Sequence, residues 1–401
     1  MNRRFWLHAV FLLVLILPAV HNTLSKSDRK KKPQKKSNNW DEIKKENDNL
    51  EKEFQVDNNG EQLSVASILR DHDKLCTEKK KFSHPVLAYV TPWNNGGYNI
   101  AKFAAQKFTH IAPVWFHFKP EMKQRKTCIL FGMHDLDTKW LADVRANNSK
   151  IKFVPRFIID STVTKNAQQF LYDERWQTNC AQIVINFLKK NKMHGAVVEV
   201  WLQMLSLIHK DTKEELVELI VHWAELFHKF DLEIIVPFPA PLHDMKKPTG
   251  LVTKNELAKV MESVDFVNVM TYDYHTNHFA GIAPFEWVHK NLEYILSDPL
   301  INPSKIFLGL NFYGYALEGT TLKTVVGREF LEYMTAKSGT LMWNSKTKEH
   351  FLRFQSSGND GFCTYPTVAS VEVRLRLADY LNVGVGIWEL GQGLNYFTCL
   401  L

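Results

Sequence analysis

From residue 82 onward, short apolar runs alternate with longer segments whose apolar residues recur at helical spacing. Eight of the runs have the length and the β-branched or aromatic content of buried strands; they span residues 86–90, 110–116, 152–157, 195–201, 233–238, 266–272, 305–312 and 384–390. Near-continuous apolar strands are typical of a parallel sheet that is covered on both faces. The pattern therefore predicts an α/β protein with a parallel sheet.

Three of the intervening segments have clear amphipathic helical patterns. The segment 181–191 has basic residues in its last turn, and the segment 213–230 can be capped by Asp211 or Thr212. The segment 368–384 ends in Asn-Val-Gly, which is a common helix stop. Strands that alternate with helices in this way indicate repeated βα units.

Eight βα units in about 320 residues fit a (β/α)8 TIM barrel better than a doubly wound sheet. Two regions depart from the repeat. Residues 119–133 show no helical pattern and are expected to form a hairpin or loop before a helix at 138–147. Residues 317–365 are expected to form a short insertion before the last βα unit, with a hairpin around 339–355.

The N-terminus reads as a targeting segment. Arg3 and Arg4 precede a short apolar run at 5–20, which is typical of a secretory signal peptide, here residues 1–24. An uncleaved signal anchor is the alternative, and no later segment is apolar enough for a stable membrane span. Residues 25–81 are polar and are expected to be a basic, largely disordered tail, so the barrel domain is 82–401. The protein is expected to be secreted and/or lysosomal.

Most of the net charge of +7 lies outside the predicted barrel. Besides Arg3 and Arg4, residues 25–36 hold seven basic residues and one acid, which leaves the rest of the chain close to neutral. A nearly neutral body does not indicate a nucleic-acid partner. The basic run is expected to be a solvated arm, and binding to an anionic surface is the alternative.

The cysteines and one sequon give weaker signals. The five cysteines are widely spaced, so at least one stays free or pairs between chains, and most are expected to be small core residues. Asn147-Asn148-Ser149 is a sequon, which makes Asn147 a glycosylation candidate.

The predicted strand ends carry aromatic and polar residues where core packing favours Val, Ile and Leu. In a barrel these carboxyl ends gather at one mouth. Flat rings beside carboxylates and amides suit sugars. The predicted ligand-binding residues are Trp93, Trp115, Trp201, Tyr272, Asp273, Asn311, Tyr313, Trp388 and Glu389. The alternative for Trp115 and its neighbours is packing against helices.

Several of these stretches resemble the family 18 glycoside hydrolases and chitinase-like proteins. MTYDY at 270–274 is similar to the family's M-x-Y-D, and LGLNFYGY at 308–315 and GVGIWEL at 384–390 to its strands seven and eight. TLSKSD, YVTPWN, VVEVW and IWELGQGL are similar to a subgroup, the stabilin-interacting chitinase-like proteins. The resemblance implies a saccharide site in a barrel mouth.

HGAVVEVW at 194–201 stands where the family has D-G-x-D-x-D-x-E. Residue by residue, His194 replaces the first Asp, Val197 the second, Glu199 the third, and Trp201 the catalytic Glu. An indole cannot transfer a proton at physiological pH. Because side chains alternate along a strand, Glu199 and Trp201 are expected on one face, with Glu199 about 6–7 Å deeper.

Glu199 is therefore expected to be a structural carboxylate, with Tyr272, Asp273 or Arg156 as its partner. The resemblance implies that Tyr272 and Asp273 contact a sugar acetamide, and Glu389 is expected to bind ligand hydroxyls or to pair with a base. No catalytic residue is predicted. No HExxH, GxSxG or P-loop motif occurs, so neither a metal nor another cofactor is predicted.

Three functions follow as hypotheses. The first is a catalytically inactive lectin for N-acetylglucosamine-type oligosaccharides; the resemblance further implies lipopolysaccharide, innate immune sensing and a stabilin-type scavenger receptor as a partner. The second is an active glycosidase that uses Glu199, Asp273 or Glu389. The third is a protein-interaction scaffold whose mouth is closed by its own aromatic residues.

Overall fold

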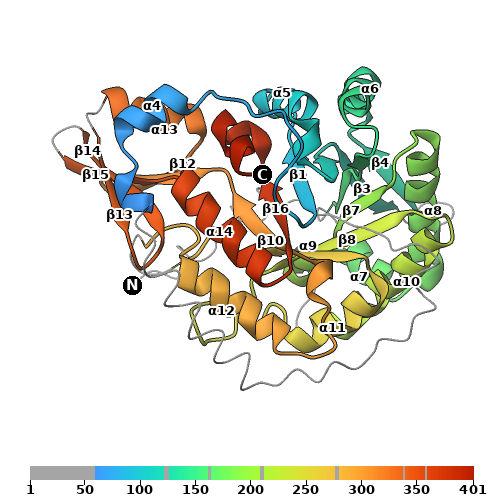
Figure 1. The fold of residues 1–401 in the computed structure, drawn as a ribbon. Coiled ribbons are helices and arrows are strands. Elements are labelled where there is room, and N and C mark those ends of the chain that lie inside the picture. Colours follow the sequence, from blue (N-terminus) through green and yellow to red (C-terminus); the bar gives the residue numbers. More distant parts are fainter. Residues whose placement is uncertain are drawn as a thin grey trace.

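A computed structural model describes residues 59–121, 126–160, 164–207, 212–275, 280–336, 339–356 and 359–401. Parallel β-strands form a closed barrel with helices outside (Figure 1). We call each of the eight strand positions in the barrel wall a stave, because two of them consist of two consecutive short strands. The staves are β1 (Val86–Val90), β2 (His110–Pro113) continued by β3 (Phe116–Glu121), β5 (Lys152–Phe153) continued by β6 (Arg156–Ile159), β7 (Gly195–Glu199), β8 (Glu233–Pro239), β9 (Phe266–Met270), β10 (Ile306–Asn311) and β16 (Gly384–Trp388). The predicted (β/α)8 barrel is confirmed.

The second and third staves are each broken once. The break after β2 holds Val114 and Trp115, and the break after β5 holds Val154 and Pro155. β2 pairs with β5, and β3 pairs with β6, so the parallel ring continues across both breaks. Pro155 has no backbone N–H to give to a ladder, which is a physical reason for an interruption there.

Helices and 3-10 turns link the staves. The outer helices are α5 (Gly96–Phe103), α6 (Thr138–Asn147), α7 (Thr164–Leu171), α8 (Glu174–Lys190), α9 (Trp201–Leu207), α10 (Lys213–His228), α11 (Lys254–Ser263), α12 (Phe285–Leu296) and α14 (Val368–Tyr380). The 3-10 turns are η2 (Ala105–Lys107), η3 (Met133–Asp135), η4 (Pro303–Lys305), η5 (Leu390–Gln392) and η6 (Asn395–Leu400). The helices expected at 138–147 and near 181–191, 213–230 and 368–384 are all present.

The region without a helical pattern forms a hairpin. β4 (Thr127–Phe131) pairs antiparallel with β3 at the edge of the sheet. A disulfide from Cys128 to Cys180 fastens this hairpin to α8. Ile129 and Phe131 alternate along β4 and lie on its exposed face.

The insertion after the seventh stave is a small antiparallel sheet with one helix. It consists of β11 (Gly314–Glu318), β12 (Thr321–Val325), α13 (Gly327–Ala336), β13 (Thr340–Asn344), β14 (Glu349–Ser356) and β15 (Asn359–Thr364). β13 and β14 form the hairpin expected around 339–355. The insertion begins three residues earlier than predicted and is larger than one hairpin.

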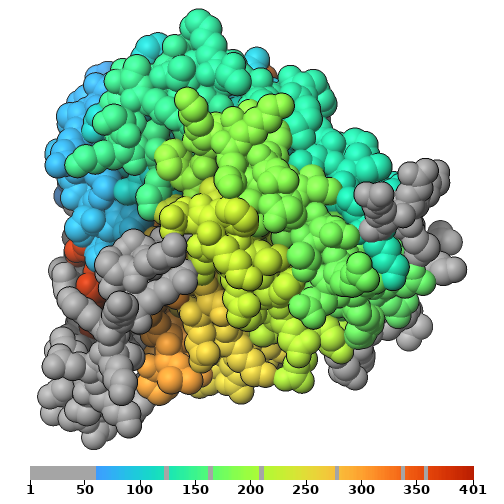
Figure 2. Space-filling model, turned by 90° about the vertical axis from the view of Figure 1, so that its right-hand side faces the viewer, coloured from blue at the N-terminus to red at the C-terminus, as the bar shows by residue number. Residues whose placement is uncertain are grey.

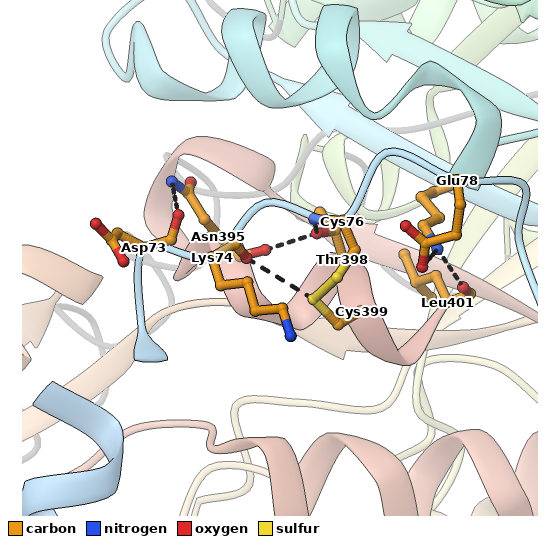
Figure 3. The surroundings of a disulfide bond; sticks show 9 residues. Asp73, Lys74, Cys76, Glu78, Asn395, Thr398, Cys399 and Leu401 are labelled. Carbon is orange, nitrogen blue, oxygen red and sulfur yellow. Dashed lines mark hydrogen bonds and ion pairs between the residues drawn. A yellow bond between two sulfur atoms is a disulfide. The ribbon is translucent and has the colours of Figure 1, made fainter. Parts of the chain in front are cut away.

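The predicted tail boundary at residue 82 is too late. α3 (Asn59–Gln62) and α4 (Val65–Asp71) belong to the folded body, and Ile68 is fully buried. Cys76 forms a disulfide with Cys399, and its backbone N–H donates to Thr398 Oγ1 at 2.9 Å (Figure 3). These contacts join segments 323 residues apart, which local composition does not reveal.

The cysteine prediction is also corrected. Four of the five cysteines form the two disulfides, and Cys363 is free and buried. The predicted signal peptide and the basic run lie outside the described residues. No described helix is long and apolar enough to cross a membrane.

Candidate functional site at the barrel mouth

Buried polar and aromatic side chains from several strands of the barrel interact with one another. Tyr89 and Trp388 come from the neighbouring strands β1 and β16, and their rings meet edge to face at 5.2 Å between centroids. Burial raises the pKa of Tyr89, and the nearby Tyr272 and Glu199 raise it further. Arg156 on β6 opposes this shift, so these groups share one electrostatic environment.

Glu199 ends β7 and is held on both oxygens. Arg156 donates to Oε2 from Nε at 3.0 Å and from Nη2 at 2.7 Å, while Gln203 Nε2 donates to Oε1. Burial raises the pKa of Glu199 to about 7. Of the three expected partners, Arg156 is the one in contact. Gln203 was missed; its signal was the i+4 spacing to Glu199.

Trp201 does not continue the strand above Glu199. It is the first residue of α9, so the strand alternation used to orient it ends at Glu199. Its indole N–H donates to the Leu251 carbonyl at 3.0 Å, and its ring packs against that of Phe238, with 4.8 Å between the ring centroids. The side chain is buried, and its single donor is occupied within the protein.

Asp273 joins the sixth and seventh staves. Its Oδ1 accepts from the Tyr313 hydroxyl at 2.5 Å and from the Tyr315 hydroxyl at 2.8 Å. Burial raises the pKa of Asp273. Asn311 Nδ2 donates to the Tyr313 carbonyl at 2.8 Å, which orders the segment that carries both tyrosines. Tyr315 was missed, although it lies two residues after Tyr313 on the same chain segment.

Glu389 is a capping group and not a free acid at the rim. Its Oε2 accepts from the Gly391 backbone N–H at 2.9 Å, at the start of η5, and its Oε1 accepts from Asn94 Nδ2 at 2.6 Å. Burial raises the pKa of Glu389 to about 7. Glu389 was expected to bind ligand hydroxyls or to pair with a base; its partners here are the Asn94 amide, the Thr91 side chain and backbone N–H groups. Asn94 was not among the predicted site residues.

The two remaining predicted tryptophans differ in exposure. Trp93, just after β1, is 62% exposed and is the accessible ring of the predicted set. Trp115 is buried, donates to the Tyr98 hydroxyl at 2.7 Å and packs against Trp140. For Trp115 the structure shows the packing arrangement that was the alternative to a place at the mouth.

Three buried polar atoms in this layer have no hydrogen-bond partner among the described residues. They are the Tyr89 hydroxyl, Trp388 Nε1 and Gln203 Oε1. Buried polar groups usually have partners, and an unsatisfied one costs about 1–3 kcal/mol. Two donors and one acceptor in this layer therefore lack a partner among the described residues.

Asn147 lies at the exposed end of α6, where a glycan could be attached. Its Nδ2 donates to the Lys102 carbonyl at 3.0 Å, and attachment there would replace this exposed hydrogen bond. Among the described residues, no group of three or more His, Cys, Asp or Glu is arranged to hold a metal ion.

Comparison with known proteins gives a consistent family match. The model of "Glycosyl hydrolases family 18" matches residues 85–393. "Uncharacterized glycosylase YvbX" of Bacillus subtilis (strain 168) is 22% identical over 226 residues, which are 53% of this chain and 62% of that protein. The chain thus spans less than two thirds of this relative.

Solved structures share the fold at low identity. A chitinase from Chromobacterium violaceum ATCC 12472 superposes with a TM-score of 0.66 at 15% identity, over 79% of this chain and 98% of that one. The spore cortex-lytic enzyme SleL of Bacillus megaterium QM B1551 gives 0.64 at 17% identity, over 81% and 74%. A mutant family 18 chitinase from Cycas revoluta in complex with (GlcNAc)4 gives 0.61 at 15% identity, over 78% and 97%.

Proposed function

This chain belongs to glycosyl hydrolases family 18, and from that membership we propose that it binds N-acetylglucosamine-type oligosaccharides without hydrolysing them. The observation that carries the proposal is the state of Glu199. Glu199 is the only carboxylate of the motif at residues 194–201, and Arg156 and Gln203 occupy both of its oxygens. A general acid has to come within hydrogen-bond reach of the leaving oxygen, and a carboxylate whose two oxygens already accept from Arg156 and Gln203 is poorly placed for that role, which supports the proposal.

The residue at the family's acid position supports the same reading. Trp201 has no transferable proton at physiological pH, and its N–H is bonded to the Leu251 carbonyl. Removing the acid leaves the other parts of a sugar site in place. These are the exposed ring of Trp93, the unpaired donors of Tyr89 and Trp388, and the Asp273 network.

The test is calorimetric titration with chito-oligosaccharides of two to six units, with tryptophan fluorescence as a second readout. Wild type is expected to give saturable binding. Trp93→Ala should weaken it about tenfold, and Trp388→Phe, which keeps a ring but removes the N–H donor, about threefold to tenfold. Leu300→Ala is the control, since Leu300 is exposed and belongs to no part of the site. Absence of saturable binding in wild type would overturn the proposal.

A second candidate function is a protein-interaction scaffold. It is favoured by the burial of Trp201, Tyr313 and Trp388, which leaves Trp93 as the exposed ring among the predicted aromatic residues. A closed mouth would bind no oligosaccharide, so the same titration separates the two functions. A saturable heat of oligosaccharide binding that is weakened in Trp93→Ala would exclude the scaffold as the main role.

The finer expectations from the family resemblance are also proposals. They are binding of lipopolysaccharide, a role in innate immune sensing, a stabilin-type scavenger receptor as partner, and a secreted and/or lysosomal location. A pull-down with the receptor ectodomain tests the receptor as a partner. Competition by lipopolysaccharide in the titration above tests lipopolysaccharide binding. Immunolocalisation of the full chain tests the location.

A further inference from the structure

A cavity lies in the outer helical layer of the barrel. It has a volume of about 470 Å³ and lies between the start of α8, the end of α7 and one face of α10. Helices α8 and α10 lie on the side of the molecule that Figure 2 turns toward the viewer. We call this cavity the α8–α10 groove. It is lined by Leu171, Tyr172, Glu174, Gln177, Glu215, Glu218, Leu219, Val221, His222 and Glu225.

The α8–α10 groove is strongly acidic. Four of its lining residues are glutamates, and among its described lining residues none is Lys or Arg. His222 is the one basic side chain; its Nδ1 lies 3.9 Å from Glu174 Oε1, and its Nε2 meets Thr178 Oγ1 at 2.8 Å. Carboxylates concentrated in a concave site favour a positively charged ligand.

An independent observation points to a ligand that donates hydrogen bonds. Gln177 is only 6% exposed, and its Nε2 donates to the Phe170 and Leu171 carbonyls at 3.1 and 2.8 Å. These bonds fix the amide and leave its Oε1 as the end that lines the groove. Glu215 Oε2 is buried there and has no partner among the described residues. Both atoms are acceptors.

The remaining walls suit a ligand with carbon atoms between its charges. Tyr172 is 60% exposed and offers its ring face, while Leu171, Leu219 and Val221 add apolar surface. A cation over an aromatic ring is attracted to its face. A groove of this size holds one small molecule. Among the described residues no set of groove side chains is arranged for a metal ion, which argues against a bare divalent cation.

We propose that the α8–α10 groove binds a small ligand that carries primary ammonium groups. An ammonium has three N–H donors and no acceptor, which matches the acceptors on Gln177 and Glu215 within a ring of carboxylates. Two sources share this chemistry: a short glucosamine oligomer, which has free amines, and a linear polyamine. The proposal does not depend on sugar binding at the barrel mouth.

The experiment is calorimetric titration of the full chain with three probes at low salt. The probes are the glucosamine trimer, its fully N-acetylated counterpart and spermidine. We expect saturable binding of one or both amine probes, weakened about tenfold in 0.5 M NaCl if a few charge pairs form. Glu215→Gln and Tyr172→Ala should each weaken it about threefold to tenfold, and circular dichroism checks that both variants fold.

Glu214→Gln is the matched control. Glu214 is the preceding residue on α10, is exposed, pairs with Lys259 at 2.8 Å and does not line the groove, so binding should stay within twofold. Equal weakening by Glu214→Gln and Glu215→Gln would mean diffuse attraction and would overturn the proposal, as would no binding of either amine probe. Binding of the glucosamine trimer but not of spermidine identifies the ligand as an amino sugar, and binding of spermidine alone identifies it as a polyamine.

Trp93→Ala separates this proposal from the proposed function. It should leave the amine probes unaffected and weaken only the N-acetylated trimer. Loss of amine binding in Trp93→Ala would place those probes at the barrel mouth and would overturn the proposal that they bind in the α8–α10 groove.

Discussion

Arg156 donates two hydrogen bonds to a single oxygen of Glu199, at 3.0 Å from Nε and 2.7 Å from Nη2. Both side chains are buried in the barrel, where an isolated charge would be strongly destabilising. The ion pair gives a physical reason why Glu199 can remain buried in this motif, although Trp201 stands where the family has its catalytic glutamate. Loss of one partner alone should therefore destabilise the fold.

Replacing Arg156 by Met should lower the free energy of unfolding by about 3–5 kcal/mol, because it leaves the Glu199 carboxylate buried and without its cation. Urea denaturation measures this value. The double variant Arg156→Met/Glu199→Leu should recover most of the loss, since it removes both charges. Arg353→Ala breaks an exposed, solvent-screened pair with Asp360 and should cost far less. A loss as small for Arg156→Met as for this control would refute a structural role for the buried pair.

The protein should not turn over a fluorogenic chitobioside. The physical reason is that Glu199 and Glu389 have both oxygens occupied, although burial raises the pKa of each to about 7, which is a range suited to a general acid. Assays at pH 4 to 8 with wild type, Glu199→Gln and Glu389→Gln should all give the blank rate. Turnover that Glu199→Gln or Glu389→Gln abolishes would instead establish the active-glycosidase hypothesis.

The contribution of Glu389 to stability should depend on pH. Burial raises its folded-state pKa to about 7, above the value of about 4.3 in an unfolded chain, so between these values the folded state binds the extra proton. Its stabilising contribution is therefore full below about pH 4.3 and is lost as pH rises to about 7. Other buried groups titrate too, so the quantity to measure is the difference between wild type and Glu389→Gln.

That difference should be larger at pH 5 than at pH 7.5, by denaturant titration at both values. Asp360→Asn is a suitable control, because burial is not what shifts the pKa of Asp360. The Arg353 guanidinium lowers it. A Glu389→Gln difference that grows from pH 5 to pH 7.5 would contradict the expected direction.

Loss of each disulfide should destabilise the fold, and the two losses should differ in size. In the chain-entropy model the Cys76–Cys399 bond, which closes 323 residues, contributes about 6 kcal/mol, and Cys128–Cys180, which closes 52, about 4 kcal/mol. Guanidinium denaturation of the paired Cys→Ala variants measures both. Cys363→Ala, which removes the free and buried thiol, serves as the control and should cost clearly less. Equal and small costs for all three would mean that the bonds constrain little of the unfolded chain.

Local pattern was enough to predict most of the barrel. The apolar runs predicted all eight staves, and the helical segments predicted α6 and α10 to within a few residues, because strand and helix periodicities depend on near neighbours. The gathering of Tyr272, Asp273, Asn311 and Trp388 at one end also followed, since parallel strands of a barrel end at a common mouth.

Tertiary structure alone decided which side chains meet and which are reached by solvent. The pairing of Glu199 with Arg156 joins two staves, and the disulfide from Cys76 to Cys399 joins residues 323 apart. The expected alternation does not apply to Trp201, because β7 ends at Glu199 and a helix begins at Trp201. Sequence therefore determined the elements and their order, whereas long-range packing decided partners, burial and the state of each acid.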